Sequence, residues 1–355
     1  MIFEIEILIQ EFKREKETKP ADINLLFIEE PEAHTHPQMQ YIFIKNIKKL
    51  LDEGIKRDDG INRSLQYLIT THSSHIVADS DFDDIKYLKV ESKNNVVAKN
   101  LSDLISKYAA DRKEYQFLKQ YLTISRAEIF FADKAILIEG DTERILIPTI
   151  MRKVDLEEVD DFLPLLSQNI SIIEVGAYSQ IFEKFIEFLG IKSLILTDID
   201  AIKITGKDKD NKDVWGACPV NEGSKTSNSA INHFLGKEII WSELKVLSVD
   251  KRTISEGKIC LCYQQEEGSY HARSFEDGFI HINRGFIDPK IGDFQGLKNR
   301  EYFDDPENNA YVLADKCIKK KTHFALDILY HSNDDFSNWQ IPAYIREGLL
   351  WLKAD

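Results

Sequence analysis

The stretch KSLILTDID, residues 192–200, decides the fold of the larger part of this chain. It is an apolar run that ends in an acidic turn holding Asp198 and Asp200. Such a run is typical of a parallel strand that is covered on both faces. Because the two aspartates stand two residues apart, an extended chain would point both carboxylates the same way. The stretch therefore predicts an acidic site at the carboxyl end of a buried strand.

Two similar strands precede this one, and a helical segment follows each of them. The strands are KAILIEG at residues 134–140 and SIIEVG at residues 171–176, and the helices begin near Thr142 and at Ser179. Alternation of strand and helix predicts an α/β unit with a Rossmann-like parallel sheet, whose strand ends meet at one edge. We expect that edge to collect Glu139 and the two aspartates.

Three carboxylates at one edge would repel one another unless a cation lies between them. Oxygen-only ligands favour Mg²⁺ or Mn²⁺ over Zn²⁺. For any one of these carboxylates a plainer role is the better interpretation, because Asp198 and Asp200 can begin a turn and Glu139 can cap the next helix. The occurrence of all three on successive units of one sheet favours the metal site.

The N-terminal part shows a second pair of strands with polar ends. LLFIEEPEAHTHP, residues 25–37, carries Glu29 and Glu30 after an apolar run, and LQYLITTHSSHI, residues 65–76, carries His72. An amphipathic helix is predicted between them, at residues 38–51. A right-handed crossover of this kind places the two polar strand ends side by side.

These residues resemble the C-terminal part of an ABC-type ATPase head. The resemblance puts Glu29 and Glu30 at the Walker B position, with Glu30 orienting water against the γ-phosphate, and makes His72 the switch histidine. Glu29 stands where that family usually has Asp. No G-x-x-x-x-G-K-[ST] phosphate loop occurs in the sequence, and no ABC signature precedes the opening helix at residues 1–17. We therefore expect a chain that begins inside an ATPase domain and that binds ATP only if a partner chain supplies Walker A.

The later motifs resemble a Toprim domain, the metal-dependent phosphodiester-handling fold. They are LIEGDTE at residues 137–143 and LTDID at residues 196–200. With RAEIFFADKAILIEGDTERILIP and EVGAYSQIFEKFIEFLGIKSLILTDID downstream of an ABC-type head, the chain resembles the OLD (overcoming lysogenisation defect) family of ATP-dependent endonucleases. The resemblance covers nearly the whole chain. It implies that Glu139, Asp198 and Asp200 bind the catalytic metal.

Two further segments are similar to parts of that family. In HARSFEDGFIHIN, residues 271–283, the resemblance implies that Glu276 joins the metal shell beside Ser274. In KKKTHFALDIL, residues 319–329, Lys321 aligns with the lysine of a family helix. Without the resemblance, Glu276 would be a charge at a helix N-terminus and the lysine run a solvated helix start. Glu143, one turn after Glu139, either reaches the same metal edge or faces water.

The resemblance implies a DNA endonuclease that uses Mg²⁺ or Mn²⁺ by a two-metal route. Glu139, Asp198 and Asp200 would hold one cation, and Glu143, Ser274 and Glu276 would help to hold the second. Lys321 would neutralise charge on the pentacovalent phosphate. The alternative is a latent Toprim subunit that waits for a chain carrying the phosphate loop. A primase or topoisomerase piece is a third interpretation, and no tyrosine here has a context that supports it.

The sequence predicts three parts. Residues 1–100 would be the end of the ATPase head, residues 101–132 a helical connector, and residues 133–355 a Toprim nuclease domain with helical additions. The strands at residues 84–90 and 95–101 would close the first part as a hairpin. Phage defence or DNA repair would be the setting that the family implies.

Composition sets outer bounds on the function. The net charge of −14 argues against a DNA-coating surface, although bound cations reverse the sign at a metal site. No apolar run reaches the length of a membrane span and no signal peptide opens the chain, so we expect a cytoplasmic protein without membrane contact. DNA and a homodimer or higher oligomer are the expected partners. The four cysteines show no C-x-x-C pair and are expected to be buried as small apolar groups.

Overall fold

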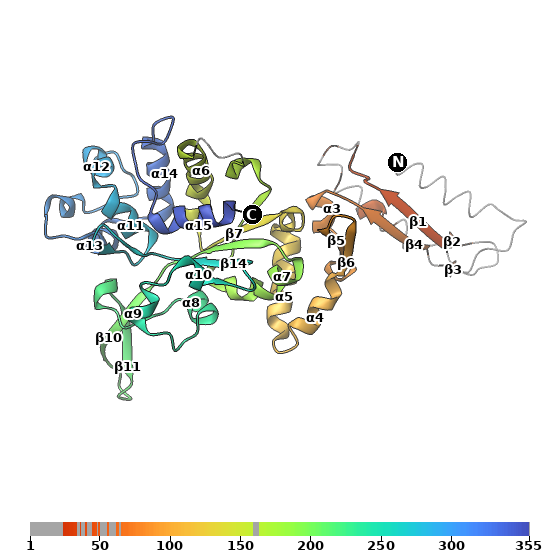
Figure 1. Cartoon of the computed structure of the whole chain (residues 1–355), viewed down its shortest axis with the longest axis horizontal. Helices are drawn as coiled ribbons and strands as arrows, with labels where there is room; N and C mark the ends of the chain where they lie inside the picture. The colour runs from red at the N-terminus through yellow and green to blue at the C-terminus, as the bar shows by residue number, and fades with distance from the viewer. Residues whose placement is uncertain are drawn as a thin grey trace, which may run out of the picture. The chain divides into compact units, whose positions relative to one another are not determined.

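The structure is a computed structural model that describes residues 24–33, 36, 40, 45–47, 49, 55–56, 62–63, 65–158 and 163–354. Its internal contacts divide it into two compact units, Met1–Phe131 and Ala132–Asp355, which Figure 1 labels by element. The helix predicted at residues 1–17, most of the helix predicted at residues 38–51 and His34 lie outside the described residues. No helix of the described part has the length and apolar character that a membrane crossing needs.

The described part of the first unit contains one parallel strand pair, two antiparallel pairs and three α-helices. Its elements are β1 Asn24–Glu29, β2 Ile55–Lys56, β3 Asn62–Arg63, β4 Leu65–Thr70, α3 Ser74–Ala78, β5 Lys86–Ser92, β6 Asn95–Asn100, α4 Leu104–Lys107 and α5 Arg112–Ser125. Strands β1 and β4 run parallel with Glu29 opposite Thr70, which confirms the two predicted neighbouring strands. Strands β5 and β6 form the predicted hairpin.

The second unit begins with the predicted alternation and ends in a group of helices. Its first elements are β7 Lys134–Ile138, α6 Asp141–Glu157, β8 Ile170–Glu174, α7 Ser179–Leu189, β9 Lys192–Leu196, β10 Ala201–Lys207, β11 Asp213–Ala217, β12 Lys225–Thr226, α8 Ser229–Phe234, α9 Trp241–Leu244 and α10 Val249–Arg252. Then come β13 Thr253–Ile254, β14 Ile259–Cys262, β15 Glu266–Glu267, β16 Tyr270–His271, α11 Phe275–Ile282, α12 Arg284–Ile287, α13 Ala310–Cys317, α14 Lys321–His331 and α15 Ala343–Lys353.

The central sheet has the strand order β13-β14-β9-β7-β8. Strands β14, β9, β7 and β8 are parallel, and β13 is an antiparallel edge strand. The chain leaves β7 toward one neighbour, β8, and then returns to the other neighbour, β9. This reversal makes the carboxyl ends of β7 and β9 the switch point of the sheet, where open α/β sheets bind their ligands.

Both faces of the sheet are covered, which explains the continuous apolar strands. On one face, alternate residues of β7, β9 and β14 join a core with α6, α11, α13, α14 and α15. Figure 1 shows α14 beside α6 and α13 beside α11. The other alternate residues of these strands are also buried, and on that side α7 packs against β9. The two crossover helices α6 and α7 therefore lie on opposite faces, as right-handed connections in opposite directions require.

Local details confirm one prediction and correct another. All four cysteines are buried and free, and Cys260 and Cys262 lie on the same face of β14. The aspartates do not follow an extended chain, because β9 ends at Leu196 and Asp200 has a φ of 47°. The prediction that an extended backbone points both carboxylates the same way is therefore wrong.

Candidate metal centre

The switch point of the sheet brings together residues from three parallel strands. Glu139 follows β7, Asp198 follows β9, and Gln264 lies two residues beyond β14. Glu143 reaches back from the first turn of α6 and accepts a hydrogen bond from the Gly140 amide at 3.2 Å. The acidic residues that the sequence predicts at the sheet edge therefore share one edge.

Glu139 is held by two polar side chains. Its Oε1 accepts hydrogen bonds from the Thr197 hydroxyl and, at 2.9 Å, from the Asn228 amide. Burial raises the pKa of Glu139, and these hydrogen bonds oppose that shift. The negative charge of Asp200 adds to the rise in pKa. Glu139 thus lies close to another carboxylate, Asp200, and accepts hydrogen bonds from Thr197 and Asn228.

Asp198 has different donors. Its Oδ1 accepts from Nε2 of Gln264 at 2.6 Å and from the backbone amide of Phe275 at 3.1 Å. Burial holds the pKa of Asp198 well above its ordinary value, and repulsion from Glu139 and Glu276 acts in the same direction. Positive charge nearby stabilises the anion of an aspartate in this position, and Lys321 already acts on Asp198 in that direction.

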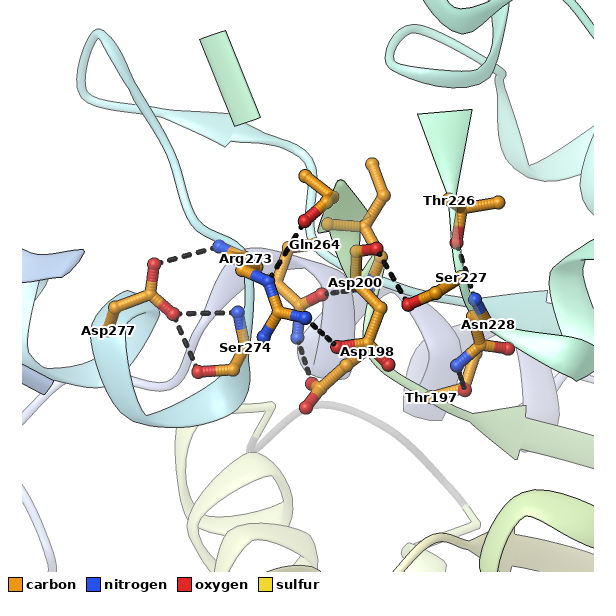
Figure 2. Close-up of polar contacts among 12 residues, drawn as sticks. Thr197, Asp198, Asp200, Thr226, Ser227, Asn228, Gln264, Arg273, Ser274 and Asp277 are labelled. Carbon is orange, nitrogen blue, oxygen red and sulfur yellow. Dashed lines mark hydrogen bonds and ion pairs between the residues drawn. The ribbon is translucent and has the colours of Figure 1, made fainter. Parts of the chain in front are cut away.

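Asp200 is paired with an arginine that the sequence analysis did not single out. Arg273 places Nη2 2.8 Å from Oδ1 of Asp200, as Figure 2 shows, and its Nε donates to the carbonyl of Ala201 at 3.2 Å. The Asp200 amide donates to the Arg273 carbonyl at 3.4 Å. The corner after Asp198 is therefore fixed from the segment that precedes α11.

Glu276 and Lys321 form an ion pair on the helical side of the same site. Lys321 Nζ lies 2.9 Å from Glu276 Oε2, and Thr142 donates to Glu276 Oε1 at 3.3 Å. The Glu276 side chain is 4% exposed, whereas that of Lys321 is 62% exposed. Burial lowers the pKa of Lys321, but the charges of Glu276 and Asp198 outweigh it and leave that pKa raised.

Glu143 is close enough to these residues for its charge to be affected by them. Burial raises the pKa of Glu143 to about 7, and repulsion from Glu276 and Glu139 contributes to that rise. A hydrogen bond that the side chain accepts from the backbone amide of Glu143 and the positive charge of Lys321 both oppose the rise in pKa. The sequence left open whether Glu143 reaches the metal edge or faces water, and the structure favours the first of these.

Ser274 has a structural contact instead. Its hydroxyl and its amide donate to Oδ1 of Asp277, at 2.7 and 2.6 Å, at the start of α11. Figure 2 shows this pair, with Arg273 between it and the two aspartates. The Ser274 hydroxyl therefore bonds to the carboxylate that caps the start of α11.

The acidic residues form a charged edge and not a finished coordination shell. No three acidic, histidine or cysteine side chains of the described residues are already arranged to hold a metal ion. The physical reason is that carboxylates without a cation repel, so Glu139, Asp198 and Asp200 each bond to separate donors. Five carboxylates face the two cations Lys321 and Arg273, which leaves an excess of three negative charges if all are ionised. This oxygen-only set of ligands fits Mg²⁺ or Mn²⁺.

The first unit contains the other predicted pair. Glu30 lies directly after β1, and its Oε1 is 3.3 Å from Nε2 of His72, which follows β4. Both side chains are well exposed, at 48% and 80%. Glu29 is the last residue of β1 and pairs with Thr70. The structure thus brings Glu30 and His72 together, as the crossover predicts.

Sequence reasoning missed the neutral and cationic partners of the carboxylates: Thr197, Asn228, Gln264 and Arg273. Two of them carried a usable signal. Thr197 lies inside the LTDID motif, and Gln264 ends the strand-like run ICLCYQ, so both occupy strand ends. Asn228 and Arg273 lie in loop segments where their register against the sheet could not be derived from the chain.

An α/β domain with an acidic site at the switch point of a parallel sheet, and a lysine beside it, defines the Toprim class. Residues 130–200 match the family described as overcoming lysogenization defect protein-like, TOPRIM domain, and residues 1–77 match the AAA ATPase domain. Together with the endonuclease and nuclease relatives described next, these matches support a relationship of this chain to the OLD family.

Three similar proteins illustrate the relationship. Endonuclease GajA of Bacillus cereus (strain HuB5-5) is 30% identical over 359 residues, which cover 94% of this chain and 49% of that protein. Old nuclease of Escherichia phage P2 is 24% identical over 54% of this chain and 30% of that protein. The C-terminal region of the Burkholderia pseudomallei OLD protein aligns at 23% identity and a TM-score of 0.35, over 63% of this chain and 98% of that one. This chain therefore spans about half the length of GajA and less of Old nuclease.

Proposed function

We propose that this chain is a DNA endonuclease that depends on Mg²⁺ or Mn²⁺. The observation that carries the proposal is the meeting of five carboxylates and the exposed Lys321 at the switch point of the sheet. Relatives named as endonuclease and nuclease support the same reaction class. The net charge of −14 is compatible with a DNA substrate because divalent cations would reverse the local sign.

Each side chain has a distinct role in this proposal. Glu139, Asp198 and Asp200 would hold one cation, and Glu143 and Glu276 would hold the second. When bound, the cations would supply a nucleophilic hydroxide and stabilise the leaving oxygen of the phosphodiester. Ser274 would act indirectly, because its hydroxyl orients the first turn of α11 through Asp277.

Lys321 would act on the phosphate itself. Its ammonium is fixed by Glu276 at 2.9 Å, yet its side chain remains largely exposed. A preorganised cation in this position stabilises the extra negative charge of the pentacovalent phosphate without reorganisation. Lys321 is therefore the group that we expect to contact DNA at the reacting centre.

Cleavage of supercoiled plasmid by the purified chain tests the proposal. We expect nicking with Mg²⁺ or Mn²⁺ and none with EDTA. In the double variant Asp198→Ala, Asp200→Ala the rate of nicking should fall by about 100-fold or more. Asp315→Asn, which alters an exposed acid on α13 that is paired with Lys316, is the matched control and should cut normally. Equal cutting by the double variant and the wild type would remove the assignment, as would the absence of metal-dependent cutting by the folded wild type.

A second role is favoured by the Glu30–His72 contact at 3.3 Å in the first unit. We propose that this unit completes an ATPase site only together with a segment that carries G-x-x-x-x-G-K-[ST], and that nuclease activity is then gated by ATP. Addition of ATP to the purified chain should leave plasmid cleavage unchanged and release no phosphate. Phosphate release by the purified chain that disappears in His72→Ala would contradict the need for that segment.

A further inference from the structure

Two buried amide side chains each contact one of the carboxylates at the sheet edge. Asn228, 7% exposed, donates from Nδ2 to Glu139 at 2.9 Å and to the Thr197 hydroxyl at 2.7 Å. Gln264, 1% exposed, donates from Nε2 to Asp198 at 2.6 Å. The two amides come from different segments, one before α8 and one after β14.

The orientation of each amide is fixed by the backbone. The side-chain oxygen Oδ1 of Asn228 accepts a hydrogen bond from the Ile231 amide at 3.1 Å, because Asn228 is the N-cap of α8. The side-chain oxygen Oε1 of Gln264 accepts a hydrogen bond from the Ile199 amide at 2.8 Å. A flipped amide would turn its oxygen toward a carboxylate and its NH₂ toward a backbone N–H, so neither side chain can reverse without losing both contacts.

This arrangement gives the amides a role that a simple helix cap or core residue would not have. A buried carboxylate without a cation needs donors to keep it in place, and a carboxylate held in the wrong direction must be reoriented before it can bind a metal. The Asn228 contact extends through Thr197, whose hydroxyl donates to the same Glu139 oxygen that accepts from the amide. Two side-chain donors therefore converge on Oε1 of Glu139 and fix the direction of this carboxylate.

We propose that Asn228 and Gln264 are positioning residues that aim Glu139 and Asp198 at the site of a divalent cation. The proposal rests on the function proposed above, because it assigns the amides to the same metal site. Neither amide contacts the cation or the DNA. Their effect passes through the two carboxylates, in the way that groups behind a metal ligand set the direction of that ligand.

Binding of Mn²⁺ alone, measured by isothermal titration calorimetry on the full chain without DNA, tests this role. Asn228→Ser keeps an N-cap side chain for α8 but removes the NH₂ donor, so the helix start is preserved. Gln264→Met keeps the length of the side chain and removes both hydrogen bonds. We expect each substitution to raise the Mn²⁺ dissociation constant by about tenfold or more.

Asn283 provides the matched control. It is also a buried amide, 3% exposed, and it bonds to the backbone of Gln340 through Nδ2 at 3.0 Å and Oδ1 at 2.6 Å. Asn283→Ser should lower the thermal midpoint in EDTA and leave the Mn²⁺ dissociation constant within about twofold of the wild type. A purely structural role for Asn228 and Gln264 would produce that same pattern in their variants.

The outcomes separate the two proposals. If the wild type binds Mn²⁺ and Asn228→Ser, folded by circular dichroism, binds it equally well, the positioning role of Asn228 is wrong and the metal site stands. Unchanged affinity in Gln264→Met has the same meaning for Gln264. If the folded wild type binds no Mn²⁺, the metal site itself fails and the positioning role fails with it.

Discussion

Arg273 places its Nη2 2.8 Å from Oδ1 of Asp200, at a corner where Asp200 has a φ of 47°. The guanidinium also donates to the Ala201 carbonyl, so it holds both the side chain and the backbone of this corner. A carboxylate oxygen that is paired with arginine is a weaker ligand for a cation that binds beside it. Arg273 is therefore a competitor for one ligand of the proposed metal site.

Replacement of this arginine should strengthen metal binding. In Arg273→Gln, Asp200 loses its ion pair and the site loses one positive charge, and both changes favour a divalent cation. We expect the Mn²⁺ dissociation constant to fall by up to about tenfold, which corresponds to about 1.4 kcal/mol. Arg284→Gln, on α12, breaks a comparable pair with Asp288 and should leave the constant unchanged. Weaker Mn²⁺ binding in Arg273→Gln would show that the arginine supports the metal site.

Lys321 should separate catalysis from metal binding. Lys321→Gln removes the exposed cation beside Glu276, which the proposed mechanism uses on the phosphate and not on the metals. We expect plasmid cleavage to fall by about 100-fold while Mn²⁺ binding is retained or strengthened. Lys320→Gln, one residue earlier, exchanges another exposed lysine and should cut normally. Normal cleavage by Lys321→Gln would exclude the lysine from the reaction.

The pKa of Glu143 predicts a pH dependence of stability in EDTA. Burial raises this pKa from 4.5 to about 7, so the folded protein binds the proton more tightly than the unfolded chain does. The contribution to stability is therefore complete below pH 4.5 and is lost as the pH rises through about 7. Between about pH 5 and pH 8 the free energy of unfolding should fall by on the order of 2 kcal/mol from this group.

Urea unfolding of the Glu143→Gln variant across that range provides the measurement. The slope of stability against pH should become flatter, because glutamine does not titrate. Glu307→Gln, in an exposed loop, is the control and should keep the slope of the wild type. If the slope in Glu143→Gln matches that of the wild type, the raised pKa does not belong to Glu143.

The sheet could be predicted from sequence because its signals are local. Strand and helix alternate in β7, α6, β8, α7 and β9, and the strands β7 and β9 are continuous apolar runs that can be recognised from the local sequence. The positions of Glu139 and Asp198 at one edge follow from this alternation and the right-handed crossover rule alone. The contact between Glu30 and His72 was predictable for the same reason.

The conformation of Asp200 could not be predicted in this way. The pattern Asp-x-Asp reads as an extended chain, but the bend at Asp200 depends on Arg273, which lies far along the sequence. Strand β14 raises a similar difficulty, since its four residues become a central strand only by pairing with β9. Long-range pairs of this kind fix the register of Asn228 and Gln264 against the carboxylates. The run ICLCYQ places Gln264 at a strand end, but it does not indicate which carboxylate the side chain contacts.

Gly296 links the packing of the C-terminal helices to the placement of Lys321. A Cβ atom at Gly296 would lie 2.3 Å from the backbone nitrogen of Phe324 and 2.6 Å from its Cα, on the first turn of α14. The Gly296 amide also donates to Asp327 of the same helix at 2.6 Å. Because backbone atoms cannot turn aside, an added methyl group must push α14 away and shift Lys321, the first residue of that helix.

Gly296→Ala should therefore lose both stability and cleavage. We expect a decrease in the free energy of unfolding of about 1–3 kcal/mol or more, which is the usual cost of forcing an extra carbon into a packed interior. Plasmid cleavage, measured where the variant is still folded, should also decrease because Lys321 is displaced from Glu276. Gly292→Ala is a close control, since nothing lies within 4 Å of an added Cβ there, and it should match the wild type in both assays. Wild-type stability in Gly296→Ala would mean that α14 moves freely enough to absorb the methyl group, and that its position does not fix Lys321.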